Sequence, residues 1–304
     1  MMSSAPRVTV GLPVYNGAAT LESAVRPLLA QTFSDFELLI SDNASTDATP
    51  EITARLARED ARVRVVRQAV NLGANGNYSF VAENARGSLL KWASASDWIA
   101  PSFLERCVKA LDANPDAVLA APRTRLFEGN PEGAVGVNYD GDFDLLAATP
   151  LARLEQFFAS ERLNNAFNGL IRLSALRQTR LVEPYLCADI VLMGHLALLG
   201  KFVLVDEVLY YRRMEVGTST TLQDPASRMR HHYPVLDART LFQEWKQQLG
   251  WLRAGLSAPM ESAERARVVG YLLRRMVWCR DGLMRDLRDA ARYTLGRRAP
   301  LHGT

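Results

Sequence analysis

The first fifty residues constrain the fold more than any other part of this chain. An apolar run at Val8–Asn16 is followed by a helical stretch that ends at Gln31-Thr32. A second apolar run, Phe36–Ile40, leads directly into Ser-Asp-Asn-Ala-Ser-Thr-Asp at residues 41–47. A strand that ends in such acceptor groups just before a helix places them at the carboxyl edge of a parallel sheet. Open α/β sheets bind their ligands at that edge, so we expect a ligand site there.

Strand and helix patterns alternate through the following residues. The pattern predicts further helices at residues 46–59, 75–85, 102–114, 151–160 and 189–199. It predicts further strands at residues 63–66, 88–93, 117–121, 168–172, 202–205 and 208–212. Strands that alternate with helices of about 10 to 15 residues argue for an α/β fold with a mostly parallel sheet and helices on both faces.

The pattern changes after about residue 217. Apolar residues recur at helical spacing over residues 237–248 and 263–292, and no strand pattern returns. We therefore expect two parts: an α/β domain over residues 1–222 and a helical region over residues 223–304.

Composition excludes several classes of protein. The 304 residues carry a net charge of +3, which gives no sign of nucleic-acid binding. The three cysteines, Cys107, Cys187 and Cys279, lie far apart and predict reduced thiols in a cytoplasmic protein. The few residues before Val8 leave no room for a signal peptide. No apolar run reaches the roughly 20 residues that cross a membrane, so we expect a soluble or membrane-peripheral protein.

Three motifs carry a family resemblance: Pro-x-Tyr-Asn at 13–16, Gln-Thr at 31–32, and the 41–47 segment. Together they resemble the start of a family 2 inverting glycosyltransferase, and the similarity extends over residues 7–213. The resemblance implies a GT-A nucleotide-diphospho-sugar transferase fold, which is a Rossmann-like mixed sheet flanked by helices, here with a C-terminal helical extension. It also implies a nucleotide-sugar donor, UDP-linked, and a glycan, lipid-linked or small-molecule glycoside acceptor.

The resemblance assigns the nucleotide pocket to the ends of the first two strands. Tyr15 is placed to stack on a base, and Asp42 to accept hydrogen bonds from the base or the ribose. The family motifs carry these roles onto Pro13, Tyr15, Asn16 and Asp42. The alternative is structural, with Asp42 and Asp47 as helix caps and Tyr15 as a half-buried strand-end aromatic.

A turn further along matches a second donor-side motif. Asn71-Leu72-Gly73 resembles the family's Asn-x-Gly turn near the donor, so Asn71 and Gly73 are also expected at the nucleotide. By itself, this pair is an ordinary turn signal.

The segment at residues 89–98 is expected to hold a metal. Relatives have two or three acidic residues here, and the last one binds Mg²⁺ or Mn²⁺ at the diphosphate. Asp97 stands in the ligand position, and Ser96 stands where an acid is usual and can bond the ribose or a metal-bound water. A hard divalent cation often binds through one or two carboxylates plus substrate phosphates. The alternative is that Asp97 caps the helix that starts near Pro101.

The segment at residues 186–190 is expected to supply the catalytic base. Asp189 matches the family position whose carboxylate deprotonates the acceptor hydroxyl, while Ala188 replaces the common preceding Glu. The alternative is an N-cap for the following helix. Residues 209–212 resemble the family's Leu-x-Tyr-Arg strand, which places Arg212 near the diphosphate or the loop after it. His195, on an apolar helix, is expected to be a core histidine.

The C-terminal region is basic. Residues 261–304 contain ten arginines and five acidic residues, a charge of about +5, interleaved with apolar residues that include Trp278. Such helices can lie on an anionic membrane, pack on the catalytic domain with solvated arginines, or form a homodimer.

Three other functions compete with the glycosyltransferase interpretation, and the sequence disfavours each of them. A nucleotidyltransferase would need a Gly-rich basic loop after the first strand, and a dehydrogenase would need G-x-G-x-x-G there. Residues 13–17, Pro-Val-Tyr-Asn-Gly, provide neither. A catalytically impaired nucleotide-sugar-binding or scaffolding protein remains an alternative, because Ser96 and Ala188 each replace an acid. Retention of Asp97 and Asp189 argues against it.

Overall fold

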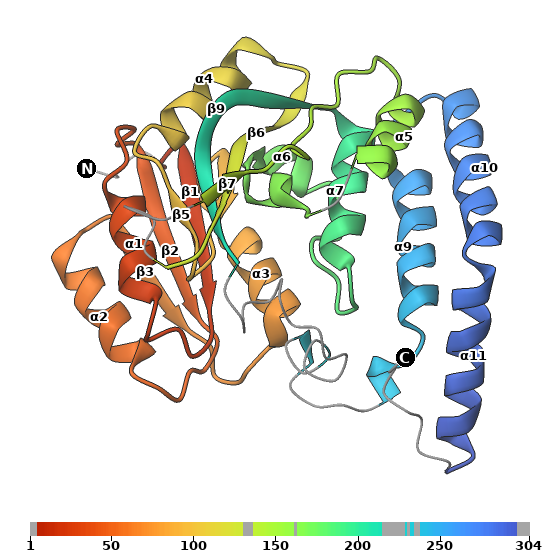
Figure 1. Cartoon of the computed structure of the whole chain (residues 1–304), viewed down its shortest axis with the longest axis horizontal. Coiled ribbons are helices and arrows are strands. Elements are labelled where there is room, and N and C mark those ends of the chain that lie inside the picture. Colours follow the sequence, from red (N-terminus) through yellow and green to blue (C-terminus); the bar gives the residue numbers. More distant parts are fainter. Residues whose placement is uncertain are drawn as a thin grey trace.

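One mixed sheet organises the molecule. The computed structural model describes residues 5–129, 136–160, 163–214, 229, 232–233 and 238–296 (Figure 1). The strand order is β3-β2-β1-β4-β8-β6-β9-β5, and β7 pairs with β6.

The first half of the sheet is parallel, as expected. Neighbouring strands β3 and β2, β2 and β1, and β1 and β4 all pair in parallel. These strands are β1 (Val8–Val14), β2 (Phe36–Asp42), β3 (Val63–Arg67) and β4 (Leu89–Trp92). The helices between them are α1 (Leu21–Leu29), α2 (Thr49–Glu59) and α3 (Gly73–Glu83). The parallel pairing brings Val14 and Asp42 side by side at the carboxyl edge.

The second half of the sheet is mixed, so the mostly parallel sheet predicted from alternation is wrong there. β8 runs antiparallel to β4 and β6, and β5 runs antiparallel to β9, whereas β6 and β9 are parallel. These strands are β5 (Trp98–Ile99), β6 (Ala117–Phe127), β7 (Gly136–Asn138), β8 (Leu170–Arg172) and β9 (Lys201–Arg213). The two short strands expected at 202–212 form the single strand β9, because β6 pairs with it along its whole length through register shifts near Pro122.

Side chains alternate between two cores, one on each face of the sheet. Leu38 and Ile40 of β2 face a cluster with α1, α2 and α4 (Phe103–Ala113), while Leu39 faces the other cluster. That second core holds α3, α5 (Pro150–Ser160), α6 (Leu173–Leu176) and α7 (Ala188–Leu199). Short 3₁₀ helices at Asn165–Asn168 and Ala238–Thr240 complete the described elements.

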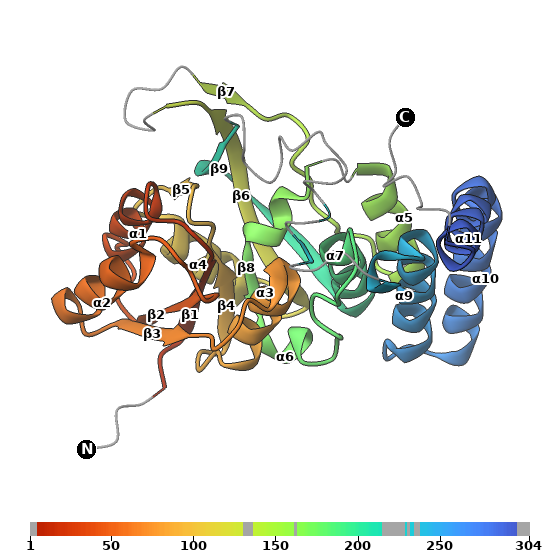
Figure 2. The same ribbon diagram turned by 90° about the horizontal axis from the view of Figure 1, so that it is seen from below.

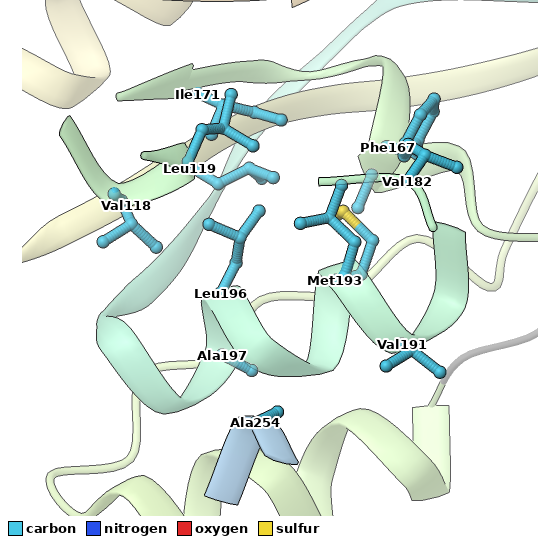
Figure 3. Packing of buried hydrophobic residues seen from close by; sticks show 14 of the residues in the cluster. Val118, Leu119, Phe167, Ile171, Val182, Val191, Met193, Leu196, Ala197 and Ala254 are labelled. Carbon is cyan, nitrogen blue, oxygen red and sulfur yellow. The ribbon is translucent and has the colours of Figure 1, made fainter. Parts of the chain in front are cut away.

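Helix α7 is apolar because it is covered on opposite sides. In Figure 3 its Met193 and Leu196 lie toward Leu119 and Ile171 of the sheet, while Ala254 of the next helix layer lies on the other side.

Three helices follow: α9 (Gln243–Ser257), α10 (Ser262–Trp278) and α11 (Arg280–Thr294). α9 packs beside α7, and α10 and α11, stacked end to end, form one outer layer beyond α9 (Figure 1 and Figure 2). α9 begins later than residue 237 because residues 238–240 are 3₁₀ and Phe242 has a left-handed backbone, with φ of 60°. The helix expected over 263–292 is divided at Cys279.

The expected domain boundary near residue 222 lies outside the described residues. In the described part of the chain, no helix is both long and apolar enough to cross a bilayer.

Candidate active site

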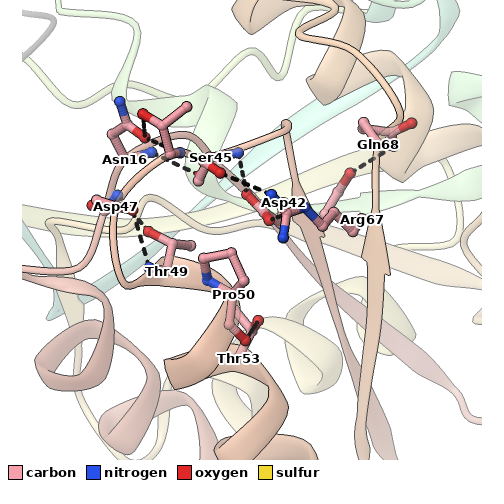
Figure 4. A network of polar contacts seen from close by, with 12 residues as sticks. Asn16, Asp42, Ser45, Asp47, Thr49, Pro50, Thr53, Arg67 and Gln68 are labelled. Carbon is pink, nitrogen blue, oxygen red and sulfur yellow. Dashed lines mark hydrogen bonds and ion pairs between the residues drawn. The ribbon is translucent and has the colours of Figure 1, made fainter.

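Asp42 lies at the carboxyl end of β2 and is almost completely buried. Its Oδ1 accepts the Ser45 N–H at 3.0 Å, and Arg67 Nε lies 3.5 Å from its Oδ2. Oδ2 accepts no hydrogen bond from the described part of the chain (Figure 4). Since buried polar atoms are normally paired, this oxygen is a candidate ligand contact.

The loop after β1 is fastened to the loop after β2 (Figure 4). Asn16 has a φ of 50°, and its N–H donates to Ser45 Oγ at 2.9 Å. Its Oδ1 accepts the Thr46 N–H at 2.9 Å. Pro13 lies within β1, opposite Ser41, and the Tyr15 side chain is 50% exposed. Asn16 therefore shapes the loop, while Tyr15 has an accessible ring.

Asp47 is not the N-cap residue of α2, which is Ala48, but it lies directly before that residue and bonds two loops. Its carboxylate accepts the backbone N–H groups of Ala18 and Thr49, each at 3.0 Å. Burial raises the pKa of Asp47, but hydrogen bonds from Thr49 and Ala18 outweigh it and the pKa is lowered overall. Asp47 therefore joins the two loops.

Asn71 and Gly73 are brought to the same loop by Asn43, a residue that the sequence reasoning did not single out. Asn43 Nδ2 donates to Asn71 Oδ1 at 3.0 Å, and Asn43 Oδ1 accepts the Leu72 N–H at 2.8 Å. Gly73 has a φ of 74°, which favours glycine. The signal for Asn43 was its place beside Asp42 in the strand-end motif.

The Gln-Thr motif supports the segment that carries Asp97. Gln31 Nε2 donates to Ala100 O at 2.8 Å, and Gln31 Oε1 accepts the Leu104 N–H at 3.0 Å. The Thr32 N–H donates to Pro101 O at 2.9 Å. The motif thus fixes the start of α4 rather than contacting a ligand directly.

Asp97 is held by β9. The Tyr210 hydroxyl donates to its Oδ2 at 2.6 Å, and the Arg213 N–H donates to its Oδ1 at 3.0 Å. Ser96 Oγ lies 2.9 Å from Ser94 Oγ, and its carbonyl accepts from Arg213 Nε. Helix α4 has Ser102 at its N-cap position, so the helix-cap interpretation of Asp97 is wrong.

Asp189 lies in the first turn of α7 and accepts a hydrogen bond from Asn164. The Asn164 Nδ2 to Asp189 Oδ2 distance is 2.8 Å. The N-cap residue of α7 is Cys187, with φ of 60°, so the N-cap interpretation of Asp189 is wrong. Asn164 itself has φ of 49°, and its buried Oδ1 has no hydrogen-bond partner in the described chain. Sequence reasoning missed Asn164.

Arg212 hydrogen-bonds to residues on either side of Asn164. Its Nη1 donates to the Leu163 carbonyl and, at 2.6 Å, to Asn165 Oδ1. Asn165 Nδ2 in turn donates to Asp142, whose pKa is raised by burial. Residues 163–165 therefore connect Arg212 to Asp189.

The pKa of the buried Tyr78 phenol is influenced by the charges of Asp97, Asp189 and Arg212. Burial raises the pKa of Tyr78, and the negative charges of Asp97 and Asp189 raise it further, while Arg212 lowers it. Burial also lowers the pKa of Lys91, which lies in β4 with its Nζ 5.8 Å from the Tyr210 ring centroid, to about 8. Adjacent residues of β9 reach the segments of both carboxylates: Arg213 bonds Asp97, and Arg212 bonds Asn165, next to the Asn164 that bonds Asp189.

His195 is a core histidine, as expected. It is buried in α7, and burial lowers its pKa to about 4. Its ring is therefore neutral near pH 7.

The mixed sheet, with polar side chains at the carboxyl ends of β1, β2 and β4, has the architecture of the GT-A class of transferases. Residues 9–168 match the family described as glycosyl transferase family 2, so the chain belongs to that family and is a glycosyltransferase.

The chain is similar in sequence to a curated glycan synthase and in fold to solved glycosyltransferase structures. Chondroitin synthase of Pasteurella multocida is 24% identical over 76% of this chain and 23% of its own length. The structure of S. aureus TarS 1-349 in complex with UDP-GlcNAc has a TM-score of 0.61 at 17% identity, covering 89% of this chain and 72% of that one. A mannosyltransferase from Pyrobaculum calidifontis, in complex with GDP-Man and Mn²⁺, has a TM-score of 0.51 at 17% identity, covering 97% and 88%. The chain spans only 36% and 31% of the first two curated relatives it matches.

A divalent cation would find one strong ligand here. Among the described residues, no group of three or more His, Cys, Asp or Glu side chains could hold a metal. Each Asp97 carboxylate oxygen accepts one hydrogen bond from the described part of the chain and so keeps a second acceptor position. The residues fit a cation that takes most of its other ligands from phosphates and water.

Proposed function

We propose that this chain transfers a sugar, with inversion, from a UDP-linked donor to a hydroxyl group of a glycan or glycoconjugate. The observation that carries the proposal is that adjacent residues of β9 reach the segments of both carboxylates: the Arg213 N–H donates to Asp97, and Arg212 donates to Asn165, next to the Asn164 that donates to Asp189. One carboxylate is held by Tyr210 and the other by Asn164. Two carboxylates with separate supports suit two separate tasks: leaving-group binding and proton removal.

The donor's nucleotide would bind at the carboxyl edge of β1 and β2. The unbonded Asp42 Oδ2 would accept a hydrogen bond from the base or ribose, and the exposed Tyr15 ring would stack on the base. The other donor candidates shape the surrounding loops: Pro13, Asn16, Asn71 and Gly73.

The diphosphate would lie near Asp97 and Ser96. Asp97 would hold Mn²⁺ or Mg²⁺, which would neutralise charge on the leaving diphosphate. Arg212 would add positive charge, because its charge acts on the same buried tyrosines, Tyr78 and Tyr210, as that of Asp97. With Ser96 in place of an acid, metal affinity would depend strongly on bound nucleotide.

Asp189 would act as the general base. Its carboxylate takes the proton of the acceptor hydroxyl as that oxygen bonds to the anomeric carbon. The bond from the anomeric carbon to the diphosphate oxygen breaks, and the diphosphate leaves with the electron pair. Base assistance of this kind contributes about 10² to 10⁴ in rate. Asn164 keeps Oδ2 oriented, which leaves Oδ1 for the hydroxyl.

The setting of the protein is also part of the proposal. We place it in the cytoplasm, because Cys107, Cys187 and Cys279 form no disulfide among the described residues. For the C-terminal helices we favour contact with a membrane over a homodimer, because the charged side chains on their exposed face are almost all arginines. A glycan acceptor is in keeping with the name of the chondroitin synthase relative.

Calorimetric titration of UDP, GDP and dTDP, each with Mn²⁺ and with EDTA, tests the donor and metal assignments. We expect UDP to bind most tightly, and more tightly with Mn²⁺ than with EDTA. Asp97→Ala should remove the effect of Mn²⁺, whereas Asp206→Ala, at an exposed carboxylate elsewhere, should keep it. Equal affinity with and without metal in the wild type would contradict the metal assignment. Nucleotide binding without any release of UDP from UDP-sugars would favour the impaired, binding-only alternative.

A further inference from the structure

Helices α10 and α11 use one face for packing on α9. The residues that they bury include Val268 and Leu272 of α10 and Leu283 of α11. Asp286 also points inward, where its carboxylate accepts the Glu244 N–H at 2.7 Å at the start of α9. This confirms that the basic helices pack on the rest of the chain. It also leaves their opposite face without a partner among the described residues.

That outer face carries an apolar stripe, which we define as Leu273, Val277, Met284 and Leu287. These side chains are 42–58% exposed. Their spacings of four, seven and three residues keep them on one side of a helix. The stripe continues across Cys279, because the Cys279 N–H donates to Arg275 O at 2.9 Å and the Leu283 N–H to Cys279 O at 3.2 Å. Its length is about 20 Å at a helical rise of 1.5 Å per residue.

On α10 and α11, most acidic side chains are largely buried and most arginines are exposed. The acids Asp286 and Asp289 are buried, and the Glu264 side chain is only 14% exposed. The exposed charged side chains are almost all arginines: Arg267, Arg274, Arg280, Arg285, Arg288 and Arg292, against the single acid Asp281. Among the described residues, Arg274, Arg285 and Arg288 make no ion pair. The outer face is therefore apolar along the stripe, with a row of arginines on one side of it, since Arg274, Arg285 and Arg288 lie about 60–120° round the helix from Leu273.

We propose that this face docks on an anionic lipid bilayer. Leu273, Val277, Met284 and Leu287 would enter the headgroup region, and the arginines beside them would contact acidic headgroups. The α10–α11 layer forms an outer edge of the molecule in two views, away from α2 and β3 (Figures 1 and 2). A flat surface can therefore reach it without contacting the parallel strands.

Charge decides between a membrane and a second copy of this chain. Two such faces in contact would bring like-charged arginines together and offer them almost no exposed acid. An anionic bilayer supplies the opposite charge along the whole stripe. The proposal does not depend on the reaction that the chain catalyses.

Vesicle co-sedimentation of the full chain provides the test. We expect binding to vesicles of phosphatidylglycerol and phosphatidylcholine, and little binding to phosphatidylcholine alone. The triple variant Arg274→Gln/Arg285→Gln/Arg288→Gln should partition about a hundredfold more weakly onto the acidic vesicles. The matched control Arg58→Gln/Arg86→Gln/Arg177→Gln removes the same charge from exposed arginines elsewhere and should bind as the wild type does.

A second pair of variants tests the apolar stripe. Leu273→Asp/Leu287→Asp should lose vesicle binding, whereas Val137→Asp/Leu146→Asp, at exposed positions far along the chain, should keep it. Circular dichroism should show that each variant is folded, because all four side chains are at least 42% exposed. Equal binding to neutral and acidic vesicles, or no binding to either, would overturn the proposal. A dimer in analytical ultracentrifugation that Leu273→Asp/Leu287→Asp abolishes, without lipid binding, would also overturn it.

Discussion

At the scale of single residues, the sequence predicts the candidate site carboxylates. It does not predict the residues that hydrogen-bond to them. Asp42, Asp97 and Asp189 each follow a strand or begin a helix in a recognisable motif. Their partners come from remote segments: Tyr210 lies 113 positions from Asp97, and Asn164 lies 25 positions from Asp189. No local pattern marks such a partner, because only the folded sheet brings β9 and residues 163–165 to the site.

Asn164 provides the first prediction. Replacing Asn164 with Ala removes the hydrogen bond that orients Asp189, so we expect kcat to fall by about 10- to 100-fold, the usual effect of a lost hydrogen bond to a charged group. Donor affinity should stay within twofold, since Asn164 lies on the acceptor side of our proposed arrangement. Asn84→Ala, at an exposed asparagine in the C-cap position of α3, serves as the control. A large loss of nucleotide affinity in calorimetry would show that Asn164 has a different role.

His195 gives a prediction about pH. Burial lowers its pKa from 6.5 to about 4. Between these values the unfolded chain binds a proton that the folded chain does not, so stability falls as the pH falls. The loss approaches about 3 kcal/mol below pH 4. Urea unfolding at pH 7 and pH 4.5 should show a smaller loss for His195→Gln than for the wild type. The same loss in both proteins would mean that His195 does not titrate in this way.

At the scale of elements, sequence periodicity located the helices and strands but not how the strands pair. The parallel half of the sheet follows from the regular strand–helix alternation. The mixed half does not, because β5 and β8 are only two and three residues long and carry little pattern. The division between α10 and α11 was also missed, since the apolar spacing continues through Cys279.

The contact between α7 and α9 depends on Gly194. A Cβ atom there would lie 2.1 Å from Trp251 Cζ3, so Gly194→Ala should force the helices apart and destabilise the fold by about 1 to 3 kcal/mol. Gly270→Ala is the matched control, because a Cβ atom at that position in α10 meets nothing within 4 Å. It should stabilise the fold by about 0.5 to 1 kcal/mol through higher helix propensity. Thermal unfolding that ranks the two variants in the opposite order would contradict this packing.

At the scale of the whole molecule, our proposal assigns donor binding and proton removal to different segments of the fold. The proposed donor residues come from the parallel strands, and Asp189 comes from α7 beyond the mixed half. Helix α3 connects them: Asn77 Nδ2 donates to Ser41 O at 2.9 Å, and Asn75 Nδ2 donates to Tyr185 O at 2.8 Å, just before α7. The asparagines after Gly73 therefore fix the distance between the two halves of the site.

The central claim is that Asp189 removes the proton while the parallel strands bind the donor. The direct test is Asp189→Asn, with UDP-sugar affinity from calorimetry and UDP release measured on the same protein. We expect affinity within twofold of the wild type and turnover lower by at least about 10²-fold, because the amide keeps the shape of the side chain but cannot accept the proton. Unchanged turnover, or loss of donor binding together with turnover, would contradict the account.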